Sequence, residues 1–248
     1  MLSPLRAWKL ILSSMVRRPA GPVTDLLMPS ARMTKSSRTL LSLIPLLVTL
    51  LWSLAGRAAE PVILIVGDSL SAGYGLAANE TWVKQLEDRL AAQGYPHKVV
   101  NASISGETTS GGRTRLPALL TRHTPAVVLL ELGGNDGLRG ISIDEMRANF
   151  ARMLEAAQGA NASAMLVAIE LPPNYGPAFL EKFRTTYREL AAEYAVPLTP
   201  FLLEGVALEP ELMQDDGIHP KAAAAPRMLE NVWPTLLPLL GKTGARTQ

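Results

Sequence analysis

The sequence predicts an α/β protein, a three-layer α/β/α sandwich around a central, mostly parallel sheet of five strands. Two observations lead to this prediction. Short apolar runs, several of them rich in Val, Ile or Leu, alternate along the chain with longer amphipathic stretches. The connections between them are short, which favours a parallel sheet covered by helices on both faces. No repeat or linker interrupts this pattern, so residues 59–240 are predicted to form one domain.

The predicted strands are short apolar runs, as expected for strands that helices cover on both sides. The first is wholly aliphatic, whereas the last is weaker. In chain order they are Val62–Val66, Lys98–Ala102, Ala126–Leu132, Met165–Glu170 and Val196–Phe201.

The predicted helices fall between these strands and carry large apolar residues on one face. The first shows the pattern clearly, with Trp82, Leu86 and Leu90 four residues apart and a stop at Gly94. The last contains three prolines, which must break or bend it. In chain order the helices are Thr81–Gln93, Arg113–His123, Ile143–Gln158, Pro177–Tyr194 and Ala222–Leu240, and the tail Gly241–Gln248 is predicted to be disordered.

Residues 1–58 are predicted to be an N-terminal extension that ends in a signal peptide. The apolar run Leu40–Leu54 follows the basic residues Lys35 and Arg38 and precedes the small residues of 55–59. The run is shorter than the ~20 residues of a membrane span. We therefore expect cleavage after Ala58 and a periplasmic or secreted protein, with an uncleaved N-terminal membrane anchor as the alternative.

The charge of the chain depends on this leader. Residues 1–59 contain eight of the 24 basic groups and one of the 22 acidic groups, so the remainder has 16 basic and 21 acidic groups, a net charge of −5. An acidic remainder gives no support for a nucleic-acid partner. The chain has no cysteine, which excludes thiolate nucleophiles, thiolate metal sites and disulfides.

Ser69 is the first candidate for chemistry. It lies in Gly67–Ser71, directly after the first predicted strand, and open α/β sheets carry their chemistry at strand ends. An isolated Gly-Asp-Ser is more often only a turn or a helix N-cap. Gly73 and Gly75 favour a loop whose backbone N–H groups can approach a ligand.

His219 and Asp216 are the second and third candidates. Of the three histidines, His97 opens a predicted strand and His123 ends a predicted helix, which favours structural roles for both, and histidines so scattered argue against a metal site. His219 lies in a loop three residues after Asp216. A carboxylate at that spacing can turn back to accept the Nδ1 proton of the ring, as in a Ser-His-Asp set. Asp215 is the alternative carboxylate.

Hydrogen-bond donors for a tetrahedral intermediate are available at two further strand ends. Asn135 follows the strand that ends at Leu132, and Gly106 follows the strand that ends near Ala102. The alternative role for Asn135 is an Asx turn at the end of its strand.

Together these segments resemble the SGNH (GDSL) hydrolase family, and the resemblance extends from the first predicted strand to the last helix. Its four blocks are represented, in order, by Gly67-Asp68-Ser69-Leu70, by Gly106 in Asn101–Gly106, by Gly133-Gly134-Asn135-Asp136 and by Asp216-Gly217-Ile218-His219-Pro220.

The resemblance implies a flavodoxin-like sandwich and a role for each matching residue. Ser69 would be the nucleophile, His219 the general base and Asp216 the carboxylate that orients it. The oxyanion hole would consist of the Ser69 backbone N–H, Gly106 and Asn135. Asp68 would be a structural acid that supports the nucleophile loop.

The implied activity is hydrolysis of carboxylic esters and thioesters of acyl chains (lysophospholipid, acyl-CoA, aryl ester) through an acyl-enzyme. The expected partner is a small-molecule substrate, with no metal or organic cofactor and a monomeric chain. A mostly apolar cleft would suit an acyl chain, and its candidate lining residues are Leu70, Leu138, Ile141, Leu171, Pro172 and Ile218.

Two other functions stay open on the sequence alone. A carbohydrate O-deacetylase of the same superfamily would share the Ser-His-Asp set. A non-catalytic exported lipid-binding protein could keep the same fold, because fold does not determine function.

Overall fold

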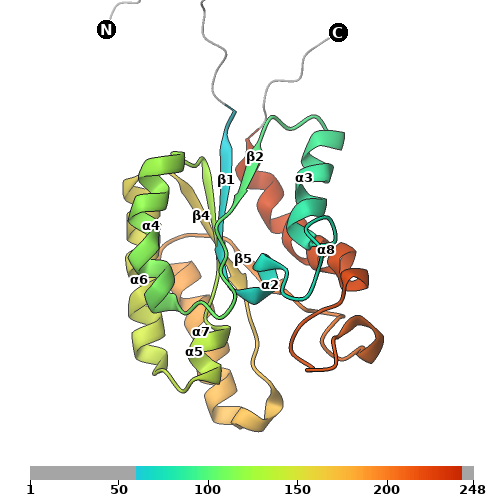
Figure 1. Ribbon diagram of the computed structural model, residues 1–248. Coiled ribbons are helices and arrows are strands. Elements are labelled where there is room, and N and C mark those ends of the chain that lie inside the picture. The colour runs from blue at the N-terminus through green and yellow to red at the C-terminus, as the bar shows by residue number, and fades with distance from the viewer. Residues whose placement is uncertain (1–59, 242–248) are drawn as a thin grey trace, which may run out of the picture. The chain divides into compact units, whose positions relative to one another are not determined.

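The central sheet consists of five strands that are all parallel (Figure 1). The computed structural model describes residues 60–241, so the predicted signal peptide and the tail beyond residue 241 lie outside the described residues. The predicted α/β class is confirmed. The strands are β1 (Val62–Gly67), β2 (Lys98–Asn101), β3 (Val127–Glu131), β4 (Ser163–Ala168) and β5 (Leu198–Phe201).

The strand order β2-β1-β3-β4-β5 places the carboxyl ends of β1 and β3 side by side. β1 pairs with β2 on one side and with β3 on the other, and Gly67 is in register with Glu131. After β1 the chain first adds β2 on one side and then adds β3, β4 and β5 on the other, so the order of strand addition reverses at β1. Open α/β sheets place their ligand sites beyond the carboxyl ends of the strands at such a reversal.

Helices cover both faces of the sheet. On one side α3 (Trp82–Ala92) packs against α8 (Ala225–Leu236), and on the other α4 (Thr109–His123) packs against α6 (Ile143–Gly159) (Figure 1). The remaining long helix, α7 (Pro177–Glu193), packs beside α6 and against β4 and β5. This is the predicted three-layer arrangement.

The predicted last helix is divided by its prolines. It begins as the 3-10 turn η4 (Ala222–Ala224), continues as α8 and ends as the 3-10 helix η5 (Leu237–Leu240). Pro226 is in the first turn of α8, where a missing N–H costs nothing. Pro234 lies within α8, so the helix tolerates one interior proline before it changes to the 3-10 form.

Four short helices in or near the loops were not predicted. The loop after β1 contains α2 (Ser69–Ala72), and the loop after β3 contains α5 (Gly134–Leu138). The 3-10 turns are η2 (Pro173–Tyr175) and η3 (Pro210–Leu212). Elements of three to five residues are too short to show a helical period in their sequence.

The core lies on both sides of the two central strands. Residues 63–66 of β1 and 127–130 of β3 are almost completely buried, which explains their continuous apolar sequence. The bulkiest fully buried side chains are those of Trp82, Phe150, Phe183 and Tyr187, from the helices. Within residues 60–241, no helix combines the length and apolarity that crossing a membrane requires.

Candidate active site

Ser69 is the first residue of α2, directly beyond the end of β1. The Asp68 side chain caps this helix by accepting a hydrogen bond of 3.0 Å from the Leu70 N–H. α2 ends after one turn because Gly73 has a left-handed backbone conformation, with φ of 77°. The serine therefore lies on a one-turn helix beyond the carboxyl end of β1, where the sequence predicted a loop.

Asp216 and His219 lie in a closed loop between η3 and η4. An isolated antiparallel bridge between Met213 and Pro220 closes the loop. Within it, Asp216 Oδ1 accepts hydrogen bonds from the N–H groups of Ile218 (2.9 Å) and His219 (3.0 Å). The carboxylate thus shapes the loop that carries the histidine.

The three candidate residues form a continuous hydrogen-bonded series. His219 Nδ1 is 2.6 Å from Asp216 Oδ2, and His219 Nε2 is 2.9 Å from Ser69 Oγ. The Tyr74 ring lies beside the imidazole, with 4.4 Å between ring centroids. Asp216, rather than Asp215, is the carboxylate that contacts the imidazole.

The charge state of Asp216 favours this arrangement. The hydrogen bond donated by His219 lowers the pKa of Asp216 to about 2, so the carboxylate is ionised over the whole neutral range. An ionised carboxylate on Nδ1 keeps the proton there and leaves Nε2 free to accept the serine proton. The series can therefore activate a hydroxyl nucleophile.

The two candidate oxyanion donors are linked to the same region. Asn135 is the second residue of α5, and its Nδ2 donates to Asp68 Oδ2 over 3.1 Å. Gly106, with φ of 79°, lies in the turn after β2. Arg139, which caps the end of α5, donates to the Gly106 carbonyl over 2.8 Å. Asn135 is thus part of α5, and Gly106 is held by the residue that ends α5.

Glu131 is a buried carboxyl group that sequence reasoning did not identify as part of the site. It is the last residue of β3 and is fully buried. Its Oε2 accepts hydrogen bonds from the Ser71 hydroxyl (2.6 Å) and from the Asp68 N–H (3.3 Å). The available signal was a glutamate at the end of an otherwise apolar strand.

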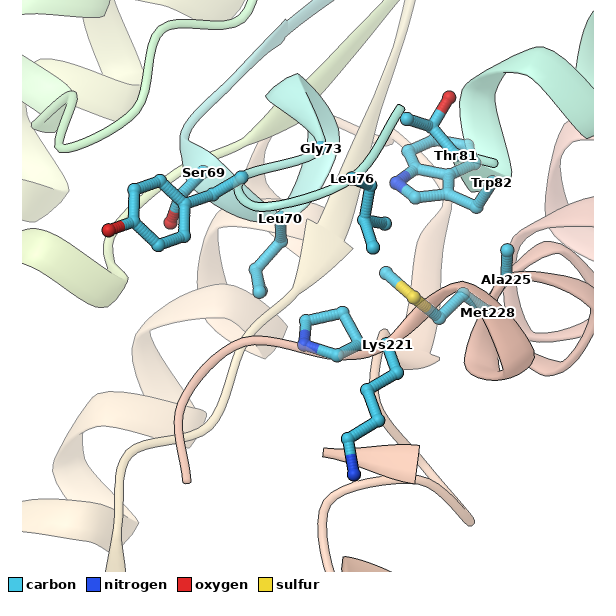
Figure 2. A pocket seen from close by; sticks show the side chains of 11 residues that line it. Ser69, Leu70, Gly73, Leu76, Thr81, Trp82, Lys221, Ala225 and Met228 are labelled. Carbon is cyan, nitrogen blue, oxygen red and sulfur yellow. The ribbon is translucent and has the colours of Figure 1, made fainter. Parts of the chain in front are cut away.

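A small pocket adjoins Ser69 on the side of α3 and α8 (Figure 2). Among the residues that the figure labels, Leu70, Leu76 and Met228 surround it together with the ring of Trp82. The sequence pattern assigned Trp82 only to the core. The lining residues are Ser69, Leu70, Gly73, Tyr74, Leu76, Thr81, Trp82, Pro220, Lys221, Ala225 and Met228.

Of the six residues predicted to line an acyl cleft, only Leu70 borders this pocket. Leu138 and Ile218 are exposed. Leu171 is buried and lies against Gly137, so its side chain is packed within the protein. Ile141 is half-buried and Pro172 is exposed. Within residues 60–241, His, Asp and Glu side chains form no group of three or more that could hold a metal ion.

Comparisons with known proteins find hydrolases that resemble most of this chain. The model of the GDSL-like lipase/acylhydrolase family matches residues 65–225. The esterase TesA of Pseudomonas aeruginosa is 52% identical over 187 residues, which cover 75% of this chain and 93% of that protein. Thioesterase 1/protease 1/lysophospholipase L1 of Escherichia coli K12 is 45% identical over 197 residues, covering 79% and 93%. A crystal structure of TesA superposes with a TM-score of 0.71 at 53% identity, covering 72% of this chain and 99% of that one.

Proposed function

This chain belongs to the GDSL-like lipase/acylhydrolase family and hydrolyses ester bonds, and from that premise we propose that Ser69, His219 and Asp216 carry the reaction. The observation that supports these roles is the series of hydrogen bonds from Asp216 through His219 to Ser69. The proposed substrates are carboxylic esters and thioesters of acyl chains, including lysophospholipid, acyl-CoA and aryl esters.

In the first half of the proposed cycle, the Ser69 hydroxyl attacks the substrate carbonyl carbon. His219 Nε2 accepts the hydroxyl proton as the C–O bond forms, and Asp216 stabilises the resulting imidazolium. The negative charge that develops on the carbonyl oxygen is received by the N–H groups of Ser69 and Gly106 and by the Asn135 amide. His219 then returns the proton to the departing alcohol or thiol, which leaves an acyl-enzyme.

The second half repeats these steps with water as the nucleophile. His219 takes one proton from water as the water oxygen adds to the acyl carbonyl. His219 then returns the proton to Ser69 Oγ as the second intermediate collapses, which releases the free acid and restores the Ser69 hydroxyl. His219 is therefore the proton acceptor and the proton donor of the protein in both halves of the cycle.

The experiment that tests the proposed roles is the Ser69→Ala variant, assayed on a short p-nitrophenyl ester. We expect kcat to fall by several orders of magnitude, about 10⁴-fold or more, with an unchanged melting temperature. Ser163→Ala is the matched control, because this exposed serine is at the opposite, amino end of β4. Activity of Ser69→Ala at the level of the unmodified protein would refute the assignment.

The substrate class is tested by comparing an acyl thioester, a lysophospholipid and an acetylated sugar. We expect the first two to be hydrolysed with the higher kcat/KM, because the pocket beside Ser69 is lined mainly by apolar side chains. The two functions that stayed open on the sequence have less support, since the named relatives are an esterase and a thioesterase. Preference for the acetylated sugar would favour the O-deacetylase.

We also propose that the chain is exported to the periplasm or secreted as a monomer, after cleavage near Ala58. The basic flank, the apolar run and the small residues of the leader support export. N-terminal sequencing of the exported protein tests the cleavage site, and its mass in solution tests the monomer. Recovery of the intact leader in the membrane fraction would favour the anchored alternative.

A further inference from the structure

Glu131 is the buried ionisable group for which the proposed mechanism provides no role. It ends β3 in register with Gly67, which ends β1, so its side chain lies directly behind the turn that carries Ser69. The residue is 0% exposed. A buried carboxyl group is costly to keep unless it is hydrogen-bonded or neutral. The presence of a carboxyl group at this buried position therefore needs a physical explanation.

The residues that Glu131 contacts lie on either side of the proposed nucleophile in the sequence. Its Oε2 accepts from the Asp68 N–H and from the Ser71 hydroxyl, one residue before and two residues after Ser69. The Ser71 carbonyl is held in turn by Asn101 Nδ2 over 2.7 Å. The turn is thus fixed from the ends of β3 and β2 as well as from its own strand.

The same cluster reaches the proposed oxyanion asparagine. The Asp68 N–H donates to Glu131 Oε2 over 3.3 Å, and the Asp68 carboxyl group accepts from Asn135 Nδ2 over 3.1 Å. Since Asn135 follows Glu131 by four residues, these bonds close a ring through the backbone of the loop after β3. A change in the position of Glu131 would therefore displace both the nucleophile and the donor amide.

We propose that Glu131 is a positioning residue for ester hydrolysis, acting as an uncharged carboxylic acid that holds the Ser69 turn and, through Asp68, the Asn135 amide. This inference rests on the proposed roles of Ser69 and Asn135. The side chain does not touch the reacting atoms.

The surrounding charges favour the uncharged form. Burial raises the pKa of the Glu131 carboxyl well above its usual value, and the neighbouring Asp68 charge raises it further. Burial also raises the pKa of Asp68 to about 6, with His219 acting in the opposite direction. Tyr187 of α7 and Asp136 of α5 also lie near this cluster, and neither supplies a positive charge. Near neutral pH these effects favour the proton on Glu131 and the negative charge on Asp68.

The first test compares Glu131→Gln with Glu131→Ala on a p-nitrophenyl ester. Glutamine has the shape of the protonated acid, with an oxygen that can accept from the Ser71 hydroxyl and the Asp68 N–H as Glu131 Oε2 does. We expect Glu131→Gln to keep kcat within about threefold of the unmodified protein. Glu131→Ala is expected to lose about 10²-fold in kcat with KM nearly unchanged, because misplacement of the reacting groups affects the transition state.

The pattern across these variants decides the outcome. Ser71→Ala, which removes one donor to Glu131, is expected to lower kcat less than Glu131→Ala does. Unchanged kcat in Glu131→Ala, or equal loss in Glu131→Gln and Glu131→Ala, would overturn the proposal.

The second test measures melting temperature against pH and requires no activity. An acid whose pKa is raised by folding destabilises the fold progressively as pH rises above its unfolded pKa, because the unfolded state then binds fewer protons. Glutamine has no such titration. We expect the stability advantage of Glu131→Gln over the unmodified protein to grow between about pH 6.5 and about pH 8.5, a range above the pKa of about 6 of Asp68.

A stability advantage that is constant or shrinks with pH would mean that Glu131 is folded as a carboxylate, and it would overturn the proposal. This melting measurement distinguishes the present inference from the proposed function. If Ser69→Ala kept full activity while the pH trend held, the mechanism would fail and the uncharged state of Glu131 would stand.

Discussion

Replacement of Asn135 by alanine tests whether the asparagine amide stabilises charge that develops during the reaction. Its Nδ2 carries two hydrogens, and one is donated to Asp68 Oδ2 over 3.1 Å. The second is the one available to the oxyanion. Loss of a single oxyanion donor typically lowers kcat by about 10²- to 10³-fold, or ~2.7–4 kcal/mol. We expect a change of that size in Asn135→Ala, with KM unchanged, because the donor acts mainly on the transition state.

The same substitution affects stability through Asp68. Asp68 is 3% exposed, so its Oδ2 loses a partner in a place that water hardly reaches. An unpaired buried acceptor costs about 1–3 kcal/mol. The Asn135 bond also lowers the pKa of Asp68, so its removal raises that pKa above the present value of about 6. The variant should therefore be less stable, and Asp68 should become protonated at a higher pH.

The assay is steady-state hydrolysis of a p-nitrophenyl ester together with thermal unfolding. Asn231→Ala is the matched control, because Asn231 of α8 is also a buried asparagine. Its side chain donates to the carbonyls of Leu202 and Glu204, which follow β5. We expect this control to lose stability while keeping kcat. A fall in kcat of less than about fivefold in Asn135→Ala, or a proportional rise in KM, would refute the oxyanion role.

Two further substitutions test the surroundings of the site. In Tyr187→Phe the buried Leu132 carbonyl loses the hydroxyl that donates to it over 2.6 Å. We expect the free energy of unfolding to fall by about 1–3 kcal/mol, and the melting temperature to fall by about 2–4 °C for each kcal/mol. We expect kcat to stay within about threefold of the unmodified protein, because Asn135 is held by a different bond. An unchanged melting temperature would contradict this. In Asp216→Asn we expect kcat to fall by between about 10²- and 10⁴-fold, because His219 loses its orienting carboxylate. The pKa of Asp216 is lowered to about 2 in the folded protein, so its stabilising effect is present above the unfolded pKa of about 4 and is lost as pH falls toward 2. The asparagine variant should lack that acid-dependent loss in a pH series of melting curves; an identical series would count against the ion pair.

Most of the fold could be predicted because its signals are local. β1 and β3 are continuous apolar runs, and their predicted bounds differ from the observed ones by one residue at most. The helix α4 begins at Thr109, four residues before its predicted start, because the Thr108 cap and two glycines precede the apolar positions. The one-turn α2 was missed for a related reason, since its start depends on the Asp68 cap and not on an apolar period.

The candidate site was likewise predictable only where its signals are local. The spacing of Asp216 and His219 predicts a pair that turns back on itself, and the loop contacts agree with this spacing. The contact between His219 and Ser69 joins residues 150 positions apart and could be anticipated only from the resemblance to a family. The apolar residues expected around an acyl chain were chosen by type alone, and only Leu70 of them borders the pocket.

By itself, the sequence determined the α/β class, the order of its strands and helices, and the residue types from which a hydrolase is built. These follow from periodicity, caps and local spacing, which act over a few residues. Only the tertiary structure decided that the ends of β1 and β3 lie side by side, which buries Glu131 next to Asp68. Burial and the charge of a neighbour determine whether a carboxyl group keeps its proton, and both depend on residues that are distant in the chain.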